Sequence, residues 1–255
     1  MTANLEEQIR QAARLISSAR HAVALTGAGI STPSGVPDFR SPGTGEWAHV
    51  NPMEVVSLTT FHQRPQRFYN WFLPVAKLMA AAKPNPAHLA LAELEKMGLL
   101  HAILTQNIDG LHQKAGSTNV IELHGSLKTL SCLKCRRSYD SEQFWPVFFN
   151  DGFIPHCPVC EATLKPDIIF FEEMLHPSAW NTAVKEASNS DVMIIVGTSL
   201  EVGPVNGLPY FVLDHRGKII INTLSNTYLD DQAEILLNCE VSYALPAIVC
   251  AILKE

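Results

Sequence analysis

The sequence lacks three features that would each indicate a class of protein. It has no excess of basic residues, since 19 Lys and Arg stand against 25 Asp and Glu and the formal net charge is −6. That balance leaves no electrostatic footprint for nucleic acid. Long apolar runs are missing too: stretches such as 192–197 have the length of a strand and are far too short to span a bilayer. No Gly-x-Ser-x-Gly elbow occurs, so a serine hydrolase is unsupported.

A secretory signal is also missing from the amino-terminal segment. Its first turns carry Glu6, Glu7, Arg10 and Arg14 where a signal peptide would have an apolar stretch. We therefore expect a soluble, cytoplasmic protein whose partners include neither nucleic acid nor a membrane. The 255 residues, 47% of them apolar, suffice for one large α/β domain or for one domain with insertions.

Short apolar segments alternate with helical patterns along most of the chain. Asn85 and Pro86 supply the N-cap and first position of one such helix. This alternation predicts a parallel sheet covered by helices on both faces. We expect strands at 22–26, 101–105, 119–123, 166–171, 191–196 and 218–222, and helices at 5–20, 86–97, 177–187, 229–237 and 244–254.

Two stretches interrupt this alternation. Residues of about 44–84 are rich in aromatic side chains and show no clear strand, and residues of about 126–165 hold most of the cysteines. We interpret both as insertions that form a smaller lobe.

Four of the six cysteines form two C-x2-C pairs separated by 21 residues. Four thiolates complete a tetrahedral zinc shell and leave no open position, which predicts a structural metal. An iron–sulfur centre and four unrelated buried cysteines are the alternatives. His156 is expected at the surface or behind a ligand, and Cys239 and Cys250 in the core. The predicted zinc ligands are Cys132, Cys135, Cys157 and Cys160.

The stretch "TGAGISTPSGVPDFRSPGTGEW", residues 26–47, follows the first expected strand. Gly27 and Gly29 would let the backbone approach a pyrophosphate and offer N–H groups to it. A tight turn without a ligand is the alternative. Thr32 stands where the dinucleotide fingerprint has its third glycine, and no acidic residue ends the next strand. An ordinary dehydrogenase is therefore poorly supported.

In an open α/β sheet the ligand lies at the carboxyl ends of the strands. We expect one crevice formed by the polar or glycine-rich segments that follow strands, namely 27–34, 106–109, 124–125, 197–199 and 222–223.

Two of these segments carry candidate reactive groups. Residues 106–109, "QNID", suit recognition of an amide-bearing ring, or they form an Asx turn that ends the strand. His124 ends a strand at the expected ligand edge, where an imidazole can act as a general base; a purely structural histidine is the alternative. His112 competes for the same role but is expected on a helical turn after Gly110.

The blocks "GAGISTPSGVPDFRSPGTG", "TQNIDGLHQKAG", "ELHG", "KPDIIFFEE", "VGTSLEVGP" and "IIIN", together with the C-x2-C pairs, resemble the sirtuins, which are NAD-dependent protein lysine deacylases. They follow the family order and span 22–222. The resemblance implies a Rossmann-like NAD-binding domain (1–43, 86–125 and 166–255), a helical insertion (44–85) and a zinc-binding insertion (126–165).

The resemblance also assigns roles to individual residues. His124 would be the general base and Asn107 a second catalytic residue. Phe39 would shield the reacting ribose, and Asp109 would bind the nicotinamide carboxamide. Acyl-lysine would contact Ile169, Phe170, Phe171 and Val202. NAD would contact Gly27, Ala28, Gly29, Ile30, Thr32, Asp38, Phe39, Arg40, Gln106, Asn107, Ile108, Asp109, His124, Gly197, Thr198, Ser199, Asn222, Glu240 and Val241.

The implied reaction consumes NAD as a co-substrate, with one structural zinc ion. The acyl oxygen attacks the ribose as nicotinamide leaves, His124 helps a ribose hydroxyl attack the acyl carbon, and water releases lysine and O-acetyl-ADP-ribose. The implied partners are proteins with acylated lysine side chains. Mono-ADP-ribosyl transfer and a non-catalytic NAD or acyl-peptide binding module are the rival functions.

Two departures from the family pattern concern the substrate. The family's substrate strand usually reads Phe-Gly-Glu, whereas this chain has Phe171, Glu172 and Glu173. That glycine allows close approach of a peptide, so a glutamate could alter peptide positioning or favour basic flanking residues. Members that prefer acidic acyl groups carry Tyr and Arg in the helical insertion, but no Arg follows Tyr69 here. Acetyl or a longer apolar acyl group is therefore expected.

Overall fold

The computed structural model describes residues 3–39 and 45–254. The chain forms two compact units. Unit 1 comprises Met1–Ser34, Lys83–Leu123 and Pro177–Glu255, and unit 2 comprises Gly35–Ala82 and His124–His176. Across the described ranges, no helix combines the length and the apolarity needed to cross a membrane.

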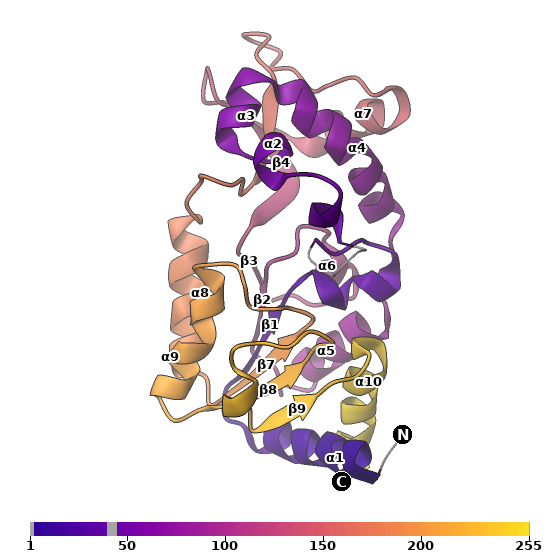
Figure 1. Ribbon diagram of the computed structural model, residues 1–255, viewed down its shortest axis with the longest axis vertical. Helices are drawn as coiled ribbons and strands as arrows, with labels where there is room; N and C mark the ends of the chain where they lie inside the picture. Colours follow the sequence, from indigo (N-terminus) through magenta and orange to yellow (C-terminus); the bar gives the residue numbers. More distant parts are fainter. Residues whose placement is uncertain (1–2, 40–44, 255) are drawn as a thin grey trace. The chain divides into compact units, whose positions relative to one another are not determined.

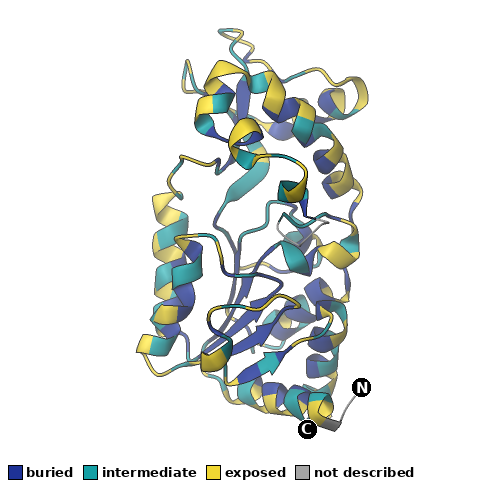
Figure 2. Cartoon of the chain, viewed as in Figure 1, coloured by how far each residue is buried: buried dark blue, intermediate teal, exposed yellow. Residues whose placement is uncertain are grey.

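Unit 1 is built on a six-stranded, fully parallel sheet with the order β3-β2-β1-β7-β8-β9. The three central strands β1, β7 and β2 are buried along their whole length (Figure 2), as expected for a parallel sheet covered on both faces. Five of the six strands expected for a parallel sheet, β1, β2, β3, β7 and β8, are confirmed within one or two residues. The strands are β1 (Ala22–Thr26), β2 (Ala102–Thr105), β3 (Val120–Glu122), β7 (Val192–Val196), β8 (Lys218–Asn222) and β9 (Ile235–Leu237).

Helices cover both faces of this sheet (Figure 1). One face packs against α1 (Ala3–Ser18), α5 (Pro86–Lys96) and α10 (Val241–Ile252), whose apolar side chains share one core cluster with the strands. The other face carries α8 (Pro177–Asn189) and α9 (Leu208–Asp214). The short helix α6 (Leu111–Lys114) follows Gly110. The fold class expected from the alternation is confirmed.

The start of α5 shows why its sequence signal was strong. The Asn85 side chain accepts a hydrogen bond from the Ala87 amide (2.9 Å) and Pro86 occupies the first helical turn. His88 completes a capping box by accepting from the Asn85 amide through Nδ1 (3.4 Å). Asn85 Nδ2 also donates to the Ile30 carbonyl at 2.7 Å, which ties this helix to the loop after β1.

The helix expected at 229–237 is wrong. That stretch contains a 3-10 turn, Asp230–Gln232, followed by the edge strand β9 beside β8. A run of three apolar residues does not distinguish a helix from a strand by periodicity. The seven-residue helix α9, with Pro209 in its first turn, is not among the helices expected from the sequence.

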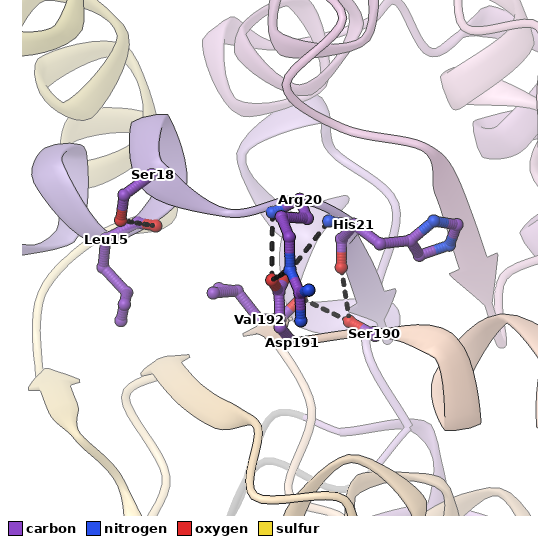
Figure 3. Close-up of polar contacts among 7 residues, drawn as sticks. All are labelled: Leu15, Ser18, Arg20, His21, Ser190, Asp191 and Val192. Carbon is purple, nitrogen blue, oxygen red and sulfur yellow. Dashed lines mark hydrogen bonds and ion pairs between the residues drawn. The ribbon is translucent and has the colours of Figure 1, made fainter.

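At the amino-terminal edge of the sheet, polar contacts join β1 to β7 (Figure 3). The Asp191 carboxylate accepts the backbone N–H groups of Arg20 and His21, each at 3.0 Å. Ser190 Oγ donates to the carbonyl groups of His21 (3.0 Å) and Val192 (2.7 Å). These contacts support the register in which Ala22 lies opposite Val192 and Thr26 opposite Val196. The loops after both strands therefore begin side by side.

Unit 2 has a helical part with an aromatic core. Phe68, Tyr69 and Phe72 of the helix α4 (Pro65–Ala81) are at most 1% exposed. Their rings contact those of Phe61 and Phe148. As expected, no strand occurs among the described residues of the 44–84 stretch. Its helices are the 3-10 turn Glu46–Ala48, α2 (Pro52–Val55), α3 (Leu58–Gln63) and α4 (Pro65–Ala81).

The cysteine-bearing part of unit 2 is a three-stranded antiparallel sheet with the order β5-β4-β6. Its strands are β4 (Gly125–Cys132), β5 (Ser138–Asp140) and β6 (Leu164–Ile168), and α7 (Trp145–Asp151) follows β5. The strand expected at 166–171 in the parallel sheet is β6, which pairs antiparallel with β4 instead. Pro166 has no N–H to donate, and β6 accordingly lies at an edge of its sheet.

Candidate functional site

The carboxyl ends of β1 and β7 bring two glycine loops together in unit 1. The Gly27 amide donates to the Val196 carbonyl (3.1 Å) and the Gly29 amide to the Gly197 carbonyl (2.8 Å). Ala28–Ile30 forms a 3-10 turn. This is the edge at which an open α/β sheet binds its ligand, so the structure brings the predicted segments 27–34 and 197–199 together.

The glycines of these loops are required by contacts between the loops themselves. A Cβ atom on Gly27 would lie 2.7 Å from Thr198 Cβ, and one on Gly29 would lie 2.8 Å from the Gly197 oxygen. Gly197 has φ +59°, and its Cβ would lie 2.2 Å from the Ile30 nitrogen. Packing between loops thus explains the glycine pattern. Approach of a pyrophosphate to Gly27 and Gly29 stays a prediction.

Replacing Gly197 by Ala is expected to destabilise unit 1 by at least about 3 kcal/mol, because overpacking adds to left-handed backbone strain. Gly116 is the matched control: its φ is also positive (+105°), but a Cβ atom there would meet nothing within 4 Å. Gly116→Ala should cost about 1–2 kcal/mol. Urea unfolding of both variants measures the difference, and equal midpoints would contradict this explanation.

The residues after β2 form a partly buried polar network with the loop after β1. Asn107 Nδ2 donates to the Gly27 carbonyl (3.1 Å) and to Ser31 Oγ (3.2 Å). Ser31 Oγ donates to Asp109 Oδ2 at 2.7 Å, and Asp109 Oδ1 accepts the Leu111 amide at 2.9 Å. Ser31 is fully buried and is not among the individual site residues predicted from the sequence, because no local pattern distinguishes it from other serines. The predicted Asx turn and the predicted recognition segment are therefore compatible. One carboxylate oxygen of Asp109 accepts the turn amide, and the other accepts the Ser31 hydroxyl.

Three further predicted residues lie at the same edge. Gln106 Nε2 donates to Thr198 Oγ1 at 3.1 Å. Asn222, at the end of β8, is fully buried and donates to the carbonyl groups of Leu237 and Cys239, both at 2.9 Å. These bonds place the residues before α10 beside Asn222, and Glu240 is the N-cap of that helix.

Asn222 also provides a test of whether the edge fits a dinucleotide. Its Oδ1 is buried and has no hydrogen-bond partner within the described part of the chain. Buried polar atoms without partners are uncommon in folded proteins, and a ribose hydroxyl is a suitable donor for this oxygen. The residues present therefore fit a nucleotide at this edge.

Two buried histidines lie behind this network. His112 is 1% exposed, its Nε2 is 2.9 Å from Thr26 Oγ1, and its ring is in edge contact with His88 at 5.0 Å. Burial, with a smaller contribution from His88, lowers the pKa of His112 to about 3. Burial also lowers the pKa of His88 to about 4, although Asp109 opposes that shift. A pKa so far below neutral makes His112 a poor general base.

These shifts predict that stability falls as the pH is lowered. A histidine whose pKa is lower in the folded state binds its proton more readily in the unfolded state. Its stability contribution is therefore complete above pH 6.5 and is lost as the pH falls toward about 3. We expect His112 alone to contribute a loss of about 2 kcal/mol between pH 6.5 and pH 5.

Urea unfolding of His112→Gln at both pH values tests this dependence, because glutamine can keep the contact with Thr26 but does not titrate. The difference between the two pH values should shrink by about that amount. His215→Gln replaces an exposed histidine of the same unit and should leave the difference as it is in the wild type. A His112→Gln protein with the full wild-type pH dependence would contradict the assignment.

His124 belongs to unit 2, at the turn before β4. Its carbonyl accepts the Ile169 amide at 2.8 Å. Gly125 follows with φ +75°, and a Cβ there would lie 2.1 Å from the Asp167 oxygen. The backbone on both sides of His124 is thus fixed by β6 and the residue after it. Convergence of 124–125 with the ligand edge of unit 1 stays a prediction.

The tail of the first loop is also part of unit 2. The carbonyl groups of Asp38 and Phe39 accept the amides of Glu46 and Trp47, both at 3.0 Å. The Phe39 and Trp47 rings stack with centroids 5.1 Å apart. Arg40 lies outside the described residues. Of the predicted substrate residues, Phe170 is buried and Phe171 is 37% exposed in unit 2, while Val202 belongs to unit 1.

The four predicted zinc ligands come together in unit 2. Their sulfur atoms all lie within 4.8 Å of one another; Cys132 and Cys160 are 3.4 Å apart and Cys135 and Cys157 3.5 Å apart. Thiolates at about 2.3 Å from a tetrahedral zinc ion lie about 3.8 Å from each other. Each pair ends in the same turn: the amide after the second cysteine donates to the carbonyl of the first, at 2.9 Å. The cluster fits one structural zinc ion.

The other candidate residues of this region have different surroundings. His156 Nδ1 lies 2.6 Å from the Ile154 carbonyl, so it bonds to its own loop and is exposed, as expected. Cys239 is half-buried. The expectation that Cys250 is a core residue is wrong, because this residue is exposed on α10.

A parallel sheet with a glycine-lined, hydroxyl-rich ligand edge defines a nucleotide-binding protein, and the four-cysteine cluster adds a structural metal module to it. The sequence model of the Sir2 family matches residues 27–204. The chain belongs to this family.

Known relatives cover nearly the whole chain. It is 43% identical over 236 residues to NAD-dependent protein deacetylase 2 of Caldanaerobacter subterraneus, covering 92% of each protein. A solved structure described as the structural basis for the mechanism and regulation of Sir2 enzymes is 40% identical, with a TM-score of 0.93 and coverage of 98% of this chain and 99% of that one. A Sir2 complex with a deacetylated p53 peptide and 3′-O-acetyl-ADP-ribose is 37% identical, with a TM-score of 0.88 and coverage of 97% and 98%.

Proposed function

We propose that this protein is an NAD-dependent protein lysine deacetylase that transfers the acyl group to ADP-ribose and releases nicotinamide. The observation that carries the proposal is the network that joins the half-buried Asn107 to the buried Ser31 and Asp109 at the ligand edge. It holds an amide and a carboxylate in fixed positions, as recognition of a carboxamide-bearing ring requires. Family membership and the product complex of a relative support the same chemistry.

The residue roles form part of this proposal. Asp109 binds the nicotinamide carboxamide, and Asn107 and Gln106 orient the ribose. Thr198 and Asn222 hold the phosphates and the second ribose. His124 accepts a proton from the ribose hydroxyl that attacks the acyl carbon. Most residues assigned to NAD belong to unit 1, with Asp38, Phe39 and His124 in unit 2. The residues assigned to the acylated protein belong to unit 2, except for Val202. The reaction takes place in the cytoplasm, where thiols such as the four zinc ligands stay reduced.

The acyl group is acetyl or another apolar chain. Tyr69, the one residue of this chain that matches the acid-binding Tyr and Arg pair of other members, is 1% exposed and its hydroxyl donates to the Leu164 carbonyl at 2.6 Å. Burial raises the pKa of this hydroxyl far above its usual range. The side chain is therefore part of the aromatic core and offers no polar contact to an acidic acyl group.

Incubation with NAD and an acetyl-lysine peptide tests the proposal. We expect free nicotinamide and deacetylated peptide in equal amounts, and little turnover of a succinyl-lysine peptide of the same sequence. ADP-ribose attached to a protein without loss of acetyl groups would favour mono-ADP-ribosyl transfer. Binding of NAD without any turnover would favour a non-catalytic module. Either result would overturn the proposal.

A further inference from the structure

The segment that follows β6 is attached to the helical part of unit 2 by its backbone. The Phe171 amide donates to the Val56 carbonyl at 3.0 Å, and the Leu58 amide donates to the Phe171 carbonyl at 3.1 Å. Phe171 thus forms a parallel bridge to Ser57, in the connection between α2 and α3. The position of Phe171 depends on this connection.

Glu172 adds a side-chain contact to the same place. Its Oε2 accepts the Thr59 amide at 2.8 Å. Thr59 lies in the first turn of α3, where backbone N–H groups have no partner within the helix and a negative charge is favourable. Ser57 caps the next amide, since its Oγ accepts from Thr60 at 3.1 Å. The carboxylate of Glu172 and the hydroxyl of Ser57 therefore satisfy adjacent amides.

The backbone at Glu172 has a conformation that favours glycine. Its φ is +74°, and a residue with a Cβ in this left-handed region loses about 1–2 kcal/mol relative to the ordinary conformation. The bond to Thr59 offsets this cost. A residue with a side chain at this position, in a strained conformation and with a charge-assisted hydrogen bond, fixes the segment more firmly than a glycine would.

The neighbouring residues fix the other side of the segment. Glu173 Oε2 accepts the Phe170 amide and pairs with Lys165 Nζ, both at 2.8 Å. The Lys165 side chain is 6% exposed, and its ammonium group also donates to the Ile168 carbonyl at 2.8 Å and lies 4.2 Å from the centre of the Phe170 ring. Phe170 is thereby held in the core, while Phe171 stays partly exposed.

We propose that Glu172 is a positioning residue for the acylated peptide: through Thr59 it holds residues 169–171 in the orientation that binds substrate. The inference rests on the proposed function, which assigns those residues to the acyl-lysine and its flanking backbone. A segment held in its binding conformation before the peptide arrives lowers the cost of ordering on binding, so loss of that hold weakens binding. Because the contact joins Thr59 to the segment assigned to the peptide, and none of these residues is assigned to NAD, it should affect the peptide and leave NAD binding unchanged.

Steady-state kinetics with an acetyl-lysine peptide that has neutral flanking residues test this inference. In Glu172→Gly, which removes the carboxylate and relieves the backbone, we expect KM for the peptide to rise about tenfold. The kcat value and KM for NAD should stay within about twofold. Glu172→Gln keeps the length and one acceptor oxygen without the charge, and should rescue part of the loss. A role in stability alone would lower kcat through loss of active enzyme and leave both KM values unchanged.

Thr59→Pro removes the backbone N–H that donates to Glu172. The helix should persist, because proline is tolerated in the first turn of a helix. The substitution should raise KM for the peptide by a similar factor, and the double variant with Glu172→Gly should show little further increase. Arg216→Gly is the matched control for relief of left-handed backbone strain. Arg216 also has a positive φ (61°) but belongs to unit 1, outside the segment assigned to the peptide.

The outcomes separate this inference from the proposed function. If the wild-type enzyme fails to deacetylate the peptide, the proposed function fails. If it deacetylates the peptide and Glu172→Gly leaves KM for the peptide unchanged, or if the effects of Thr59→Pro and Glu172→Gly multiply, the inference about Glu172 is overturned while the function stands.

Discussion

Replacement of His124 by Ala should lower kcat at least about a hundredfold, the lower range of what a general base contributes, and should leave NAD binding largely intact. The imidazole is the proposed proton acceptor for the ribose hydroxyl. The backbone around it is set by the bond from the Ile169 amide and by Gly125, which do not depend on the ring. The variant should therefore fold normally. Single-turnover kinetics and calorimetric titration with NAD measure the two quantities.

His62→Ala provides the control, since His62 is an exposed histidine on α3 of the same unit. It should retain wild-type kcat. If His124→Ala kept more than about a tenth of the wild-type kcat, the assignment of the base would be wrong. The buried His112 would not be an adequate substitute, because its lowered pKa makes it a weak acceptor and its Nε2 already contacts Thr26.

Loss of the zinc ion should have the largest effect on stability. Structural zinc contributes about 10–16 kcal/mol to the folding of isolated zinc-finger peptides. Here the four ligands join the end of β4 and the turn after it to the turn that precedes β6. Cys132→Ser should therefore unfold the three-stranded sheet of unit 2, while amides in the six-stranded sheet stay protected. Hydrogen exchange resolves the two units, and metal analysis should find one zinc ion per wild-type chain.

Cys250→Ser is the matched control for this prediction, because Cys250 is exposed and lies outside the cluster. It should change neither the zinc content nor the exchange pattern. A wild-type protein that kept its protected sheet and its activity after complete removal of the metal by a chelator would contradict the structural role.

The sequence predicted five of the six strands of the parallel sheet, because each of these five is a short apolar run between clear turn residues. The start of α5 was equally clear. The Asn85 side chain accepts a backbone amide of the first turn, and Pro86 has the backbone angle that a first helical residue needs. The spacing of the cysteines predicted the zinc cluster, because two C-x2-C pairs of reduced thiols are typical of a four-cysteine metal site.

Other features depended on tertiary contacts that no local pattern records. Residues 235–237 form a strand because they pair with the edge of β8. The strand β6 belongs to the second sheet because it pairs with β4. The sequence pattern predicts that a phosphate approaches Gly27 and Gly29. In the structure, the loop at Gly197 and Thr198 already leaves no room for a side chain at either position. Ser31 is an ordinary serine in sequence and acquires its role only from Asn107 and Asp109.

The chemical form of the nucleotide product tests the central claim most directly. Wild-type protein, NAD and an acetyl-lysine peptide should yield, by mass spectrometry, ADP-ribose carrying one acetyl group for each lysine freed, together with one nicotinamide. Free acetate and unmodified ADP-ribose from the earliest time points onward would contradict transfer of the acyl group, and with it the proposed mechanism.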